Sequence, residues 1–327
     1  MTFPIAFYAV VFIASAGVSA VSVPWWRGWS IRHGLVDDPG HRKIHHTPVP
    51  LAGGLAVFTG MALVLLLGVG AIAVKGLPTQ VLDKLDYGFE KRAFQLGSVL
   101  FGAMGMLLLG WLDDRQELSP ARKFAGQFLI AALVSMSGVR VTLFVPSILF
   151  SHGITILWIL TVTNAFNFTD NMNGLCGGLA ILGAGWFGIL AAIHEQYLVA
   201  SLAGLFTGAV AGFLPYNFPK ATVFLGDAGS HLVGYWLAVL AILPHFYSYK
   251  HPGNPWAVLS PLLVLSVPLL DLASVVWHRT LRGKPFWIGD TNHFSHRLVR
   301  LGLSKVQAVL VLWLAGMILG SVSLLIL

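Results

Sequence analysis

Long apolar runs are the feature that most constrains how this chain can fold. Ten runs, each roughly 20 residues long, contain at most one charged residue apiece. Because backbone polar groups in hydrocarbon must pair within their own segment, and about 20 helical residues cross a bilayer, each run predicts a transmembrane helix. The runs lie at residues 4–26, 51–74, 93–112, 124–139, 146–163, 175–193, 196–216, 231–247, 257–278 and 305–327. We expect an all-α, polytopic integral membrane protein with about ten transmembrane helices, organised as one domain over residues 1–327.

Composition excludes the common alternatives to a membrane protein. Hydrophobic residues make up 56% of the chain and charged residues 10%, against about 25% charged residues in an average soluble domain. The net charge of +7 is spread over short loops rather than one face or tail, which favours a membrane surface over nucleic acid as partner. The one cysteine, Cys176, rules out an internal disulfide and a cysteine-based metal site. The fourth run is short, and Pro244 interrupts the eighth.

The basic residues predict the orientation in the membrane. Loops after odd-numbered runs carry 14 of the 20 Lys and Arg residues. By the positive-inside rule these loops face the cytoplasm, and both termini lie outside. No Lys or Arg precedes Arg27, which argues against a cleaved signal peptide. Most acids share the odd side, so polar chemistry is expected at the cytoplasmic face.

Two adjacent acids end the third run. Asp113 and Asp114 stand at the membrane edge, where an Asp costs roughly 2.5–3.5 kcal/mol on insertion. Neighbouring carboxylates also oppose each other's ionisation unless a cation intervenes. Arg115, Arg122 and Lys123 follow within one loop. The pair is therefore either an interfacial ion cluster that ends the helix or part of a catalytic or metal site.

The loop after the fifth run is rich in oxygen ligands. It carries Asn164, Asn167, Asp170, Asn171 and Asn173. Amide and carboxylate oxygens suit Mg²⁺, which takes one or two protein ligands and completes its shell with water and substrate phosphates. A helix N-cap with Asx turns is the alternative, although four asparagines and an aspartate exceed what a cap needs.

A lone acid flanked by glycines precedes the eighth run. Asp227 lies between Gly226 and Gly229, just before a predicted helix N-terminus. Glycine lets a backbone approach a ligand closely, and a helix N-terminus attracts anions. A capped turn without a ligand is the alternative.

Two further loops combine cations with imidazoles. Arg42, Lys43 and His45 precede the second run, where they either reach a phosphate or fix the topology. A denser group suits phosphate binding or an anionic-lipid anchor. It follows the ninth run and consists of Arg279, Arg282, Lys284, Asp290, His293, His296, Arg297 and Arg300. Zinc is disfavoured, because nothing completes a site around the two histidines.

Together these loops predict Mg²⁺-assisted phosphoryl transfer, which needs a cation to neutralise a pyrophosphate and basic groups to position it. Six ordered motifs carry a closer resemblance. They are Arg-Lys-x-His-x-x-Pro-x-Pro-x-x-Gly-Gly at 42–54, Asp113-Asp114, Ser119-Pro-x-x-Lys123-Phe, Asn164-x-x-Asn167-x-x-Asp170, Phe224-x-Gly226-Asp227-x-Gly229-Ser230 and Asp290-x-x-His293-x-x-His296-Arg297-Leu298. On these motifs the chain resembles the polyprenyl-phosphate N-acetylhexosamine-1-phosphate transferases of glycosyltransferase family 4, over most of its length.

The resemblance implies a Mg²⁺-dependent enzyme of the bacterial inner membrane, with Mn²⁺ as the alternative ion. Such an enzyme moves N-acetylhexosamine 1-phosphate, foremost GlcNAc-1-phosphate, from a UDP-N-acetylhexosamine to undecaprenyl phosphate and releases UMP. This is the first membrane step of a cell-surface glycan. Carried over residue by residue, the metal ligands are Asn167 and Asp227, and the catalytic acids are Asp113, Asp114 and Asp170. The substrate-binding residues are Arg42, Lys43, His45, Lys123, Asn173, Phe224, His293, His296 and Arg297.

Two positions depart from the family pattern. Asn173 stands where many relatives have an acid, and Ser295 stands where they have a third histidine. An amide at 173 can still hydrogen-bond uracil.

A lipid phosphate oxygen is expected to attack the β-phosphorus of the UDP-sugar, with Asp113 or Asp114 acting as base or as electrostatic support.

The alternative functions are a phospho-MurNAc-pentapeptide transferase and a membrane transporter. The resemblance leaves open the exact sugar, the length of the lipid and whether protomers form a homodimer.

Overall fold

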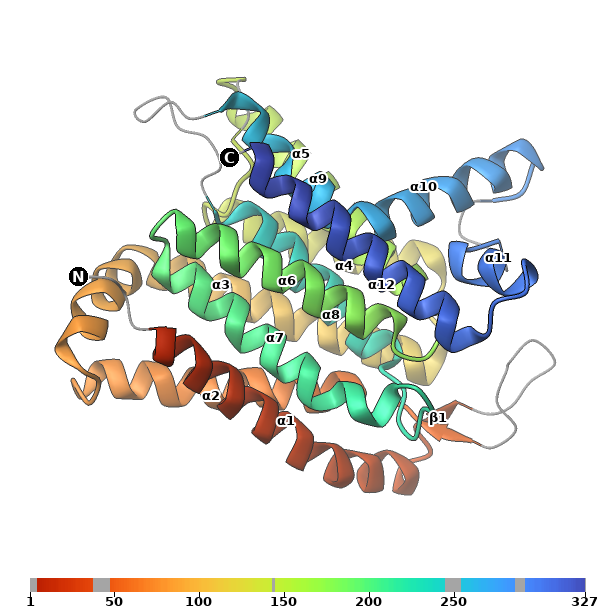
Figure 1. The fold of residues 1–327 in the computed structure, drawn as a ribbon, viewed down its shortest axis with the longest axis horizontal. Helices are drawn as coiled ribbons and strands as arrows, with labels where there is room; N and C mark the ends of the chain where they lie inside the picture. The colour runs from red at the N-terminus through yellow and green to blue at the C-terminus, as the bar shows by residue number, and fades with distance from the viewer. Residues whose placement is uncertain (1–4, 38–47, 143–144, 245–253, 286–291, 327) are drawn as a thin grey trace.

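The chain folds into a bundle in which successive long helices run in opposite directions (Figure 1). The structure is a computed structural model and describes residues 5–37, 48–142, 145–244, 254–285 and 292–326. Its elements are α1 (Ile5–Arg32), β1 (Val36–Asp37), β2 (Val49–Pro50), α2 (Gly53–Ala73), α3 (Thr79–Gln116), α4 (Pro120–Met136), α5 (Ile148–Thr169), α6 (Leu175–Ile193), α7 (Tyr197–Asn217), α8 (Gly226–Ile242), η1 (Pro255–Leu259), α9 (Ser260–Val264), α10 (Ser266–Leu281), α11 (Phe294–Arg300), α12 (Lys305–Val322) and η2 (Ser323–Ile326). The expectation of an all-α polytopic protein is confirmed.

Fewer helices are long enough to cross a membrane than the ten spans that the sequence predicts. Within the described residues, seven helices are long and apolar enough to cross a membrane, and the bent pair formed by η1–α9 and α10 makes up to eight. All ten predicted runs contain helix, but α4 and α8 have only 17 residues each. These are the fourth and eighth runs, so the expected count of ten is not confirmed.

The ninth predicted run is not one straight helix. Its two halves, Pro255–Val264 and Ser266–Leu281, are bent by 71°. Pro268 supplies the physical reason, because a proline ring clashes with the carbonyl four residues earlier, which is that of Val264. The bend changes the direction in which α10 approaches the rest of the bundle.

The centre of the bundle is α8. Fifteen of its 17 residues are buried, which is typical of a helix surrounded by protein on all sides. Glycines on neighbouring helices allow this: a Cβ at Gly110 of α3 would overlap the backbone of Asp227, and a Cβ at Gly54 of α2 would overlap that of Gly229. On α8 itself, a Cβ at Gly234 would come within 2.7 Å of the Cα of Thr163 on α5. These approaches bring the end of α3 close to the beginning of α8.

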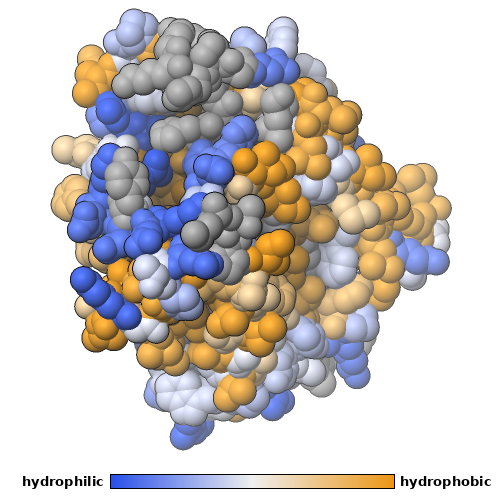
Figure 2. Space-filling view, turned by 60° about the vertical axis from the view of Figure 1, so that its left-hand side comes forward, coloured by the Kyte–Doolittle hydropathy of each residue, from blue (hydrophilic) through white to orange (hydrophobic). Residues whose placement is uncertain are grey.

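Apolar side chains cover much of the outer surface (Figure 2). Exposed examples come from several helices, such as Leu67 of α2, Phe101 of α3, Leu129 of α4 and Leu157 of α5. An apolar surface of this extent needs a nonaqueous environment. The protein is therefore a multi-pass membrane protein.

The C-terminal ends of α1, α3, α5, α7 and α10 gather at one end of the bundle, whereas α1 begins and α12 ends at the other (Figure 1). Backbone hydrogen bonds join distant loops there. The N–H groups of Ala52 and Gly53 donate to the carbonyl of Phe224 at 3.3 and 2.9 Å, and the N–H of Phe224 donates to Pro50 at 2.9 Å. The candidate site residues of the described loops thus share one end of the molecule.

Candidate active site

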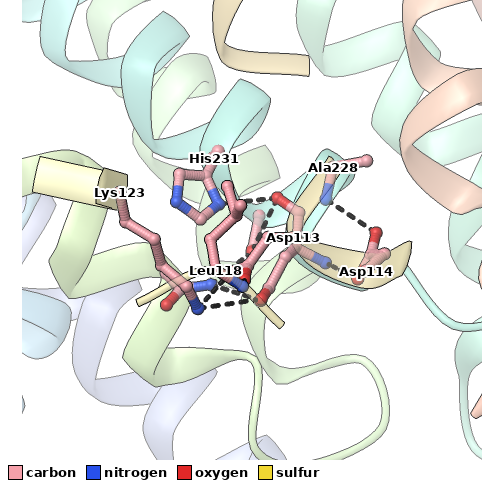
Figure 3. A network of polar contacts seen from close by, with 9 residues as sticks. Asp113, Asp114, Leu118, Lys123, Ala228 and His231 are labelled. Atoms are coloured by element: carbon pink, nitrogen blue, oxygen red, sulfur yellow. Dashed lines mark hydrogen bonds and ion pairs between the residues drawn. The ribbon is translucent and has the colours of Figure 1, made fainter. Parts of the chain in front are cut away.

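Asp114 caps the N-terminus of α8 from the end of α3 (Figure 3). Its Oδ1 accepts a 2.8 Å hydrogen bond from the backbone N–H of Asp227, and its Oδ2 accepts a 3.0 Å bond from that of Ala228. Residue 225, which directly precedes α8, offers no capping side chain, so the carboxylate satisfies N–H groups that lack partners within the helix and faces the positive end of the helix dipole. Gly226 has φ +74°, and a Cβ there would lie 2.8 Å from Asp114 Oδ2. Asp114 therefore orients the backbone that carries Asp227.

Asp113 pairs with Lys123 across the tight turn between α3 and α4. α3 ends at Gln116, the next residue Glu117 has a left-handed φ of 47°, and the N–H of Leu118 donates to Asp113 Oδ1 at 2.8 Å. Pro120 opens α4, where its fixed φ suits the first helical position. Lys123 follows one turn later and forms an ion pair with Asp113 Oδ2. Since Asp113 is only 3% exposed, its charge needs this partner.

Asp227 is the acid on which the polar network converges. Its Oδ1 accepts a 2.7 Å hydrogen bond from Asn167 Nδ2 on α5, and Lys123 Nζ lies 3.6 Å from its Oδ2. Asn167 also donates to Ser230 Oγ at 2.9 Å. The side chain of Asp227 is 35% exposed, whereas that of Asp113 is 2% exposed. Of these two acids, Asp227 is the one that a ligand can reach.

Lys123 links the two acids electrostatically. Burial alone lowers the pKa of its ammonium, but the carboxylates of Asp227 and Asp113 outweigh burial and hold that pKa above its usual value. Lys123 therefore stays charged at neutral pH, where it can neutralise part of the network or contact a phosphate.

Asp170 lies beside this network without joining it. It follows the last residue of α5, and among the described residues no hydrogen bond ties its carboxylate to the other acids. Burial raises the pKa of the Asp170 carboxyl to about 7, and the negative charge of Asp227 adds to the shift. A carboxyl that titrates near neutrality next to a charged acid is typical of a functional site.

The donor set fits a hard divalent cation. Carboxylate oxygens of Asp227 and the amide oxygen of Asn167 are the ligand type that Mg²⁺ prefers, and Asn167 donates only through its nitrogen, which leaves its Oδ1 available. Within the described ranges, no three His, Cys, Asp or Glu side chains are grouped to hold a metal ion by themselves.

A second group of side chains lies around α11. Nδ1 of His293 is 2.7 Å from Asp271 Oδ2, and the His293 ring meets that of Phe168 edge-on with centroids 6.1 Å apart. Arg279 also lies over the Phe168 ring, with its guanidinium carbon 5.1 Å from the ring centroid. Phe168 follows Asn167 directly, so α5 connects this group to the acidic network.

His296 and Arg297 are also on α11. Burial lowers the pKa of the His296 imidazole, and the neighbouring His293 and Arg300 lower it further, so His296 is neutral at pH 7. Arg297 lies over the Phe294 ring at 5.8 Å and contacts His278 at 3.4 Å. Among the described residues, no hydrogen bond, ion pair or ring contact joins either residue to Asp227 or Asn167.

Comparison with known proteins identifies the family. The profile of glycosyl transferase family 4 matches residues 96–245, which include the acidic network. A Bacillus subtilis protein named as a probable undecaprenyl-phosphate N-acetylglucosaminyl 1-phosphate transferase is 31% identical over 317 residues, covering 94% of this chain and 82% of the relative. The chain belongs to glycosyl transferase family 4.

Two further relatives extend this similarity. A decaprenyl-phosphate N-acetylglucosaminephosphotransferase of Mycolicibacterium smegmatis is 31% identical over 336 residues, which cover 95% of this chain and 80% of the relative. An undecaprenyl-phosphate alpha-N-acetylglucosaminyl 1-phosphate transferase of Yersinia pestis is 28% identical over 309 residues, which cover 90% and 77%. All three alignments span nearly the whole of this family 4 chain.

Two predicted substrate-binding residues of this family 4 protein, Asn173 and Phe224, form hydrogen bonds with the backbone of other segments. Asn173 donates to the carbonyl of Pro219 at 3.3 Å, and Phe224 uses its backbone to hold the segment that opens α2. Both contacts involve the segment between α7 and α8. Arg42, Lys43, His45 and Asp290 lie outside the described residues.

Three residues escaped the sequence analysis. His231 is 1% exposed, and its Nδ1 lies 2.7 Å from the carbonyl of Asp227, one helical turn earlier. Asn217 is 3% exposed, accepts from Gly174 N–H at 2.7 Å and donates to Val223 at 3.0 Å, so it joins two site loops. Asp271 is the third. His231 and Asp271 lie in predicted apolar runs and Asn217 directly follows one, so a polar residue in or beside an apolar run was the available signal.

Proposed function

We propose that this protein transfers GlcNAc 1-phosphate from UDP-GlcNAc to undecaprenyl phosphate, releasing UMP. The convergence of Asp113, Lys123, Asn167 and Asp227 from α3, α4, α5 and α8 is the observation that carries the proposal. The names of three relatives, all of them polyprenyl-phosphate N-acetylglucosamine phosphate transferases, support the acceptor and the sugar. The multi-pass fold suits an acceptor that lives in the bilayer.

In the proposed reaction, an oxygen of the lipid phosphate attacks the β-phosphorus of UDP-GlcNAc. The bond from that phosphorus to the bridging oxygen breaks, and UMP leaves with the electron pair. Lys123, which stays cationic, positions a phosphate oxygen and offsets charge as the bond breaks. His293, whose ring meets that of Phe168 edge-on, and Arg297 of α11 are proposed as further phosphate partners.

The geometry favours electrostatic support over base catalysis for the acidic pair. Asp114 is committed to two backbone N–H groups of α8, and Asp113 is committed to Lys123 and to the N–H of Leu118. A phosphate dianion is nucleophilic near neutral pH without a base. Asp113 and Asp114 therefore position Lys123 and Asp227, respectively.

Mg²⁺ is the proposed cofactor, with Asp227 and Asn167 as its protein ligands. When bound, it would supply charge neutralisation of the pyrophosphate. Among the acids of the network, Asp113 is offset by Lys123 and Asp114 by α8, so Asp227 is the carboxylate left for a cation.

The proposed location is the bacterial inner membrane, with the end that carries this network facing the cytoplasm. The excess of Lys and Arg in the odd loops supports this orientation. It gives the site access to a cytosolic nucleotide sugar and to the lipid of the inner leaflet.

Transfer in a purified system tests the function. Radiolabelled UDP-GlcNAc is incubated with the detergent-solubilised protein and undecaprenyl phosphate, with Mg²⁺ or with EDTA. We expect label in the lipid fraction, an equal amount of UMP, and no product in EDTA. Product from UDP-MurNAc-pentapeptide but not from UDP-GlcNAc would overturn the donor assignment.

Asp227→Asn is the decisive variant. It preserves side-chain volume but removes the charge, and we expect transfer to fall at least about 100-fold, as when an essential electrostatic group is lost. Asp83→Asn is the matched control, because Asp83 is an exposed acid near the other end of α3. Equal activity of the two variants would refute the role of Asp227.

A further inference from the structure

A second buried acid lies outside the network around Asp227. Asp271 on α10 is 5% exposed, and so is His293, which directly precedes α11. One oxygen of Asp271 lies 2.7 Å from Nδ1 of His293, and the other accepts a 2.6 Å hydrogen bond from the backbone N–H of Phe294. A single carboxylate thus holds both the imidazole and the first residue of α11.

This arrangement determines which nitrogen of His293 can meet a ligand. A carboxylate accepts hydrogen bonds, so Nδ1 carries a proton and donates it to Asp271. Nε2 is then the ring nitrogen left for a substrate. The edge-on contact with Phe168, at an interplanar angle of 87°, holds the ring from a second side.

The cost of burying the acid argues that it does more than hold α11. Removing a carboxylate from water costs several kcal/mol, and replacing a buried charged pair by apolar groups is often neutral or stabilising. A carbonyl or amide oxygen would suffice to accept the N–H of Phe294. Only an anion beside Nδ1 both fixes the tautomer and stabilises a positive charge on the ring.

We propose that Asp271 is the positioning residue for His293, so that Nε2 of the imidazole faces the phosphate groups of the nucleotide sugar. The identity of that ligand rests on the proposed function. Asp271 lies in the second half of the bent pair, Ser266–Leu281, so the proposal links this broken span to substrate binding.

An independent contact supplies a matched control. Ser295 Oγ donates a 2.6 Å hydrogen bond to Asn171 Oδ1, which ties α11 to the loop after α5. Ser295→Ala removes this anchor of α11 but leaves the bond between Asp271 and His293 in place. It therefore separates loosening of α11 from loss of imidazole orientation.

The first experiment is a double-mutant cycle with Asp271→Asn and His293→Gln, measuring kcat and KM for UDP-GlcNAc. We expect each single variant to raise KM about tenfold, equivalent to about 1.4 kcal/mol, with a smaller effect on kcat. The double variant should be no worse than His293→Gln alone, because Asp271 acts through the imidazole. Multiplicative effects, or an equal rise of KM in Ser295→Ala, would overturn the inference.

The second experiment does not depend on activity. In protein carrying ¹⁵N-labelled histidine, the His293 signals are identified by their loss in His293→Gln. We expect Nδ1 of His293 to be protonated in the unsubstituted protein and its resonance to shift in Asp271→Asn. An unprotonated Nδ1 would overturn the inference even in an active enzyme. Absence of transfer together with a protonated Nδ1 would instead refute only the proposed substrate.

Discussion

Substitution of Asp114 tests whether this acid caps α8 or reacts with substrate. Asp114→Ala leaves the N–H groups of Asp227 and Ala228, at 2.8 and 3.0 Å in the intact protein, without their acceptor. A buried donor without a partner costs about 1–3 kcal/mol, which gives about 2–6 kcal/mol for two. Because Asp114 is partly exposed and water can replace it, we expect about 2–3 kcal/mol. Asp114→Asn keeps one acceptor and should lose about 1–2 kcal/mol.

The measurement is the free energy of unfolding in mixed micelles, together with the rate of transfer. We expect both to fall in Asp114→Asn, since the backbone of Asp227 loses its support. Ser304→Ala is the control: Ser304 caps α12 through a 3.2 Å bond from Gln307 N–H, and its loss should cost about 1 kcal/mol while transfer continues. Full stability of Asp114→Asn with lost transfer would show that Asp114 reacts with substrate, and the capping argument would be wrong.

Three other predictions follow from the same geometry. Gly110→Ala should reduce folded yield and transfer, because the added Cβ would overlap the backbone of Asp227. Gly97→Ala, on the same helix, is the control: its Cβ would meet nothing within 4 Å, and the variant should match the unsubstituted protein. Equal yields of the two variants would contradict the close packing of α3 on α8. Lys123→Met should lower stability by less than the ~3–5 kcal/mol of a fully buried pair, because Lys123 is 31% exposed, and it should lower transfer strongly, with partial recovery in Lys123→Arg. Asp170→Asn should raise the melting temperature in EDTA more at pH 8 than at pH 5. The reason is that the folded protein keeps Asp170 protonated up to about pH 7 and must bury its charge above that pH. A difference in melting temperature between variant and unsubstituted protein that is constant with pH would refute the raised pKa.

Much of the site could be predicted because its chemistry is local in the sequence. Asn167 and Asp227 stand in short polar segments between apolar runs, where few other residues are candidates for a site. The alternation of spans returns every second loop to the same end, which is the end where Asn167 Nδ2 lies 2.7 Å from Asp227 Oδ1. The role of Asp114 could not be predicted in this way, since its partners lie 113 and 114 residues further along the chain.

Asp271 and His231 show a second limit. Asp271 is the one charged residue of its apolar run and His231 begins another, and hydropathy gives no direction for either side chain. Asp271 meets His293 and Phe294, which follow it by 22 and 23 residues, and the helical turn before His231 brings its ring to the carbonyl of Asp227. The start of α8 at Gly226, five residues before the predicted run of 231–247, was also invisible, because the N-terminus of α8 depends on a cap supplied by another helix.

Apolar run length and the placement of charge by themselves determined that this chain is a helical membrane protein with its polar loops on one side. The reason is that both are set by transfer from water to lipid, which each segment experiences separately. Only the tertiary structure decided which carboxylates support backbone, which pair with a cation and which remains open to a ligand. Those assignments depend on distances between helices, and close packing at glycines such as Gly110 sets these distances.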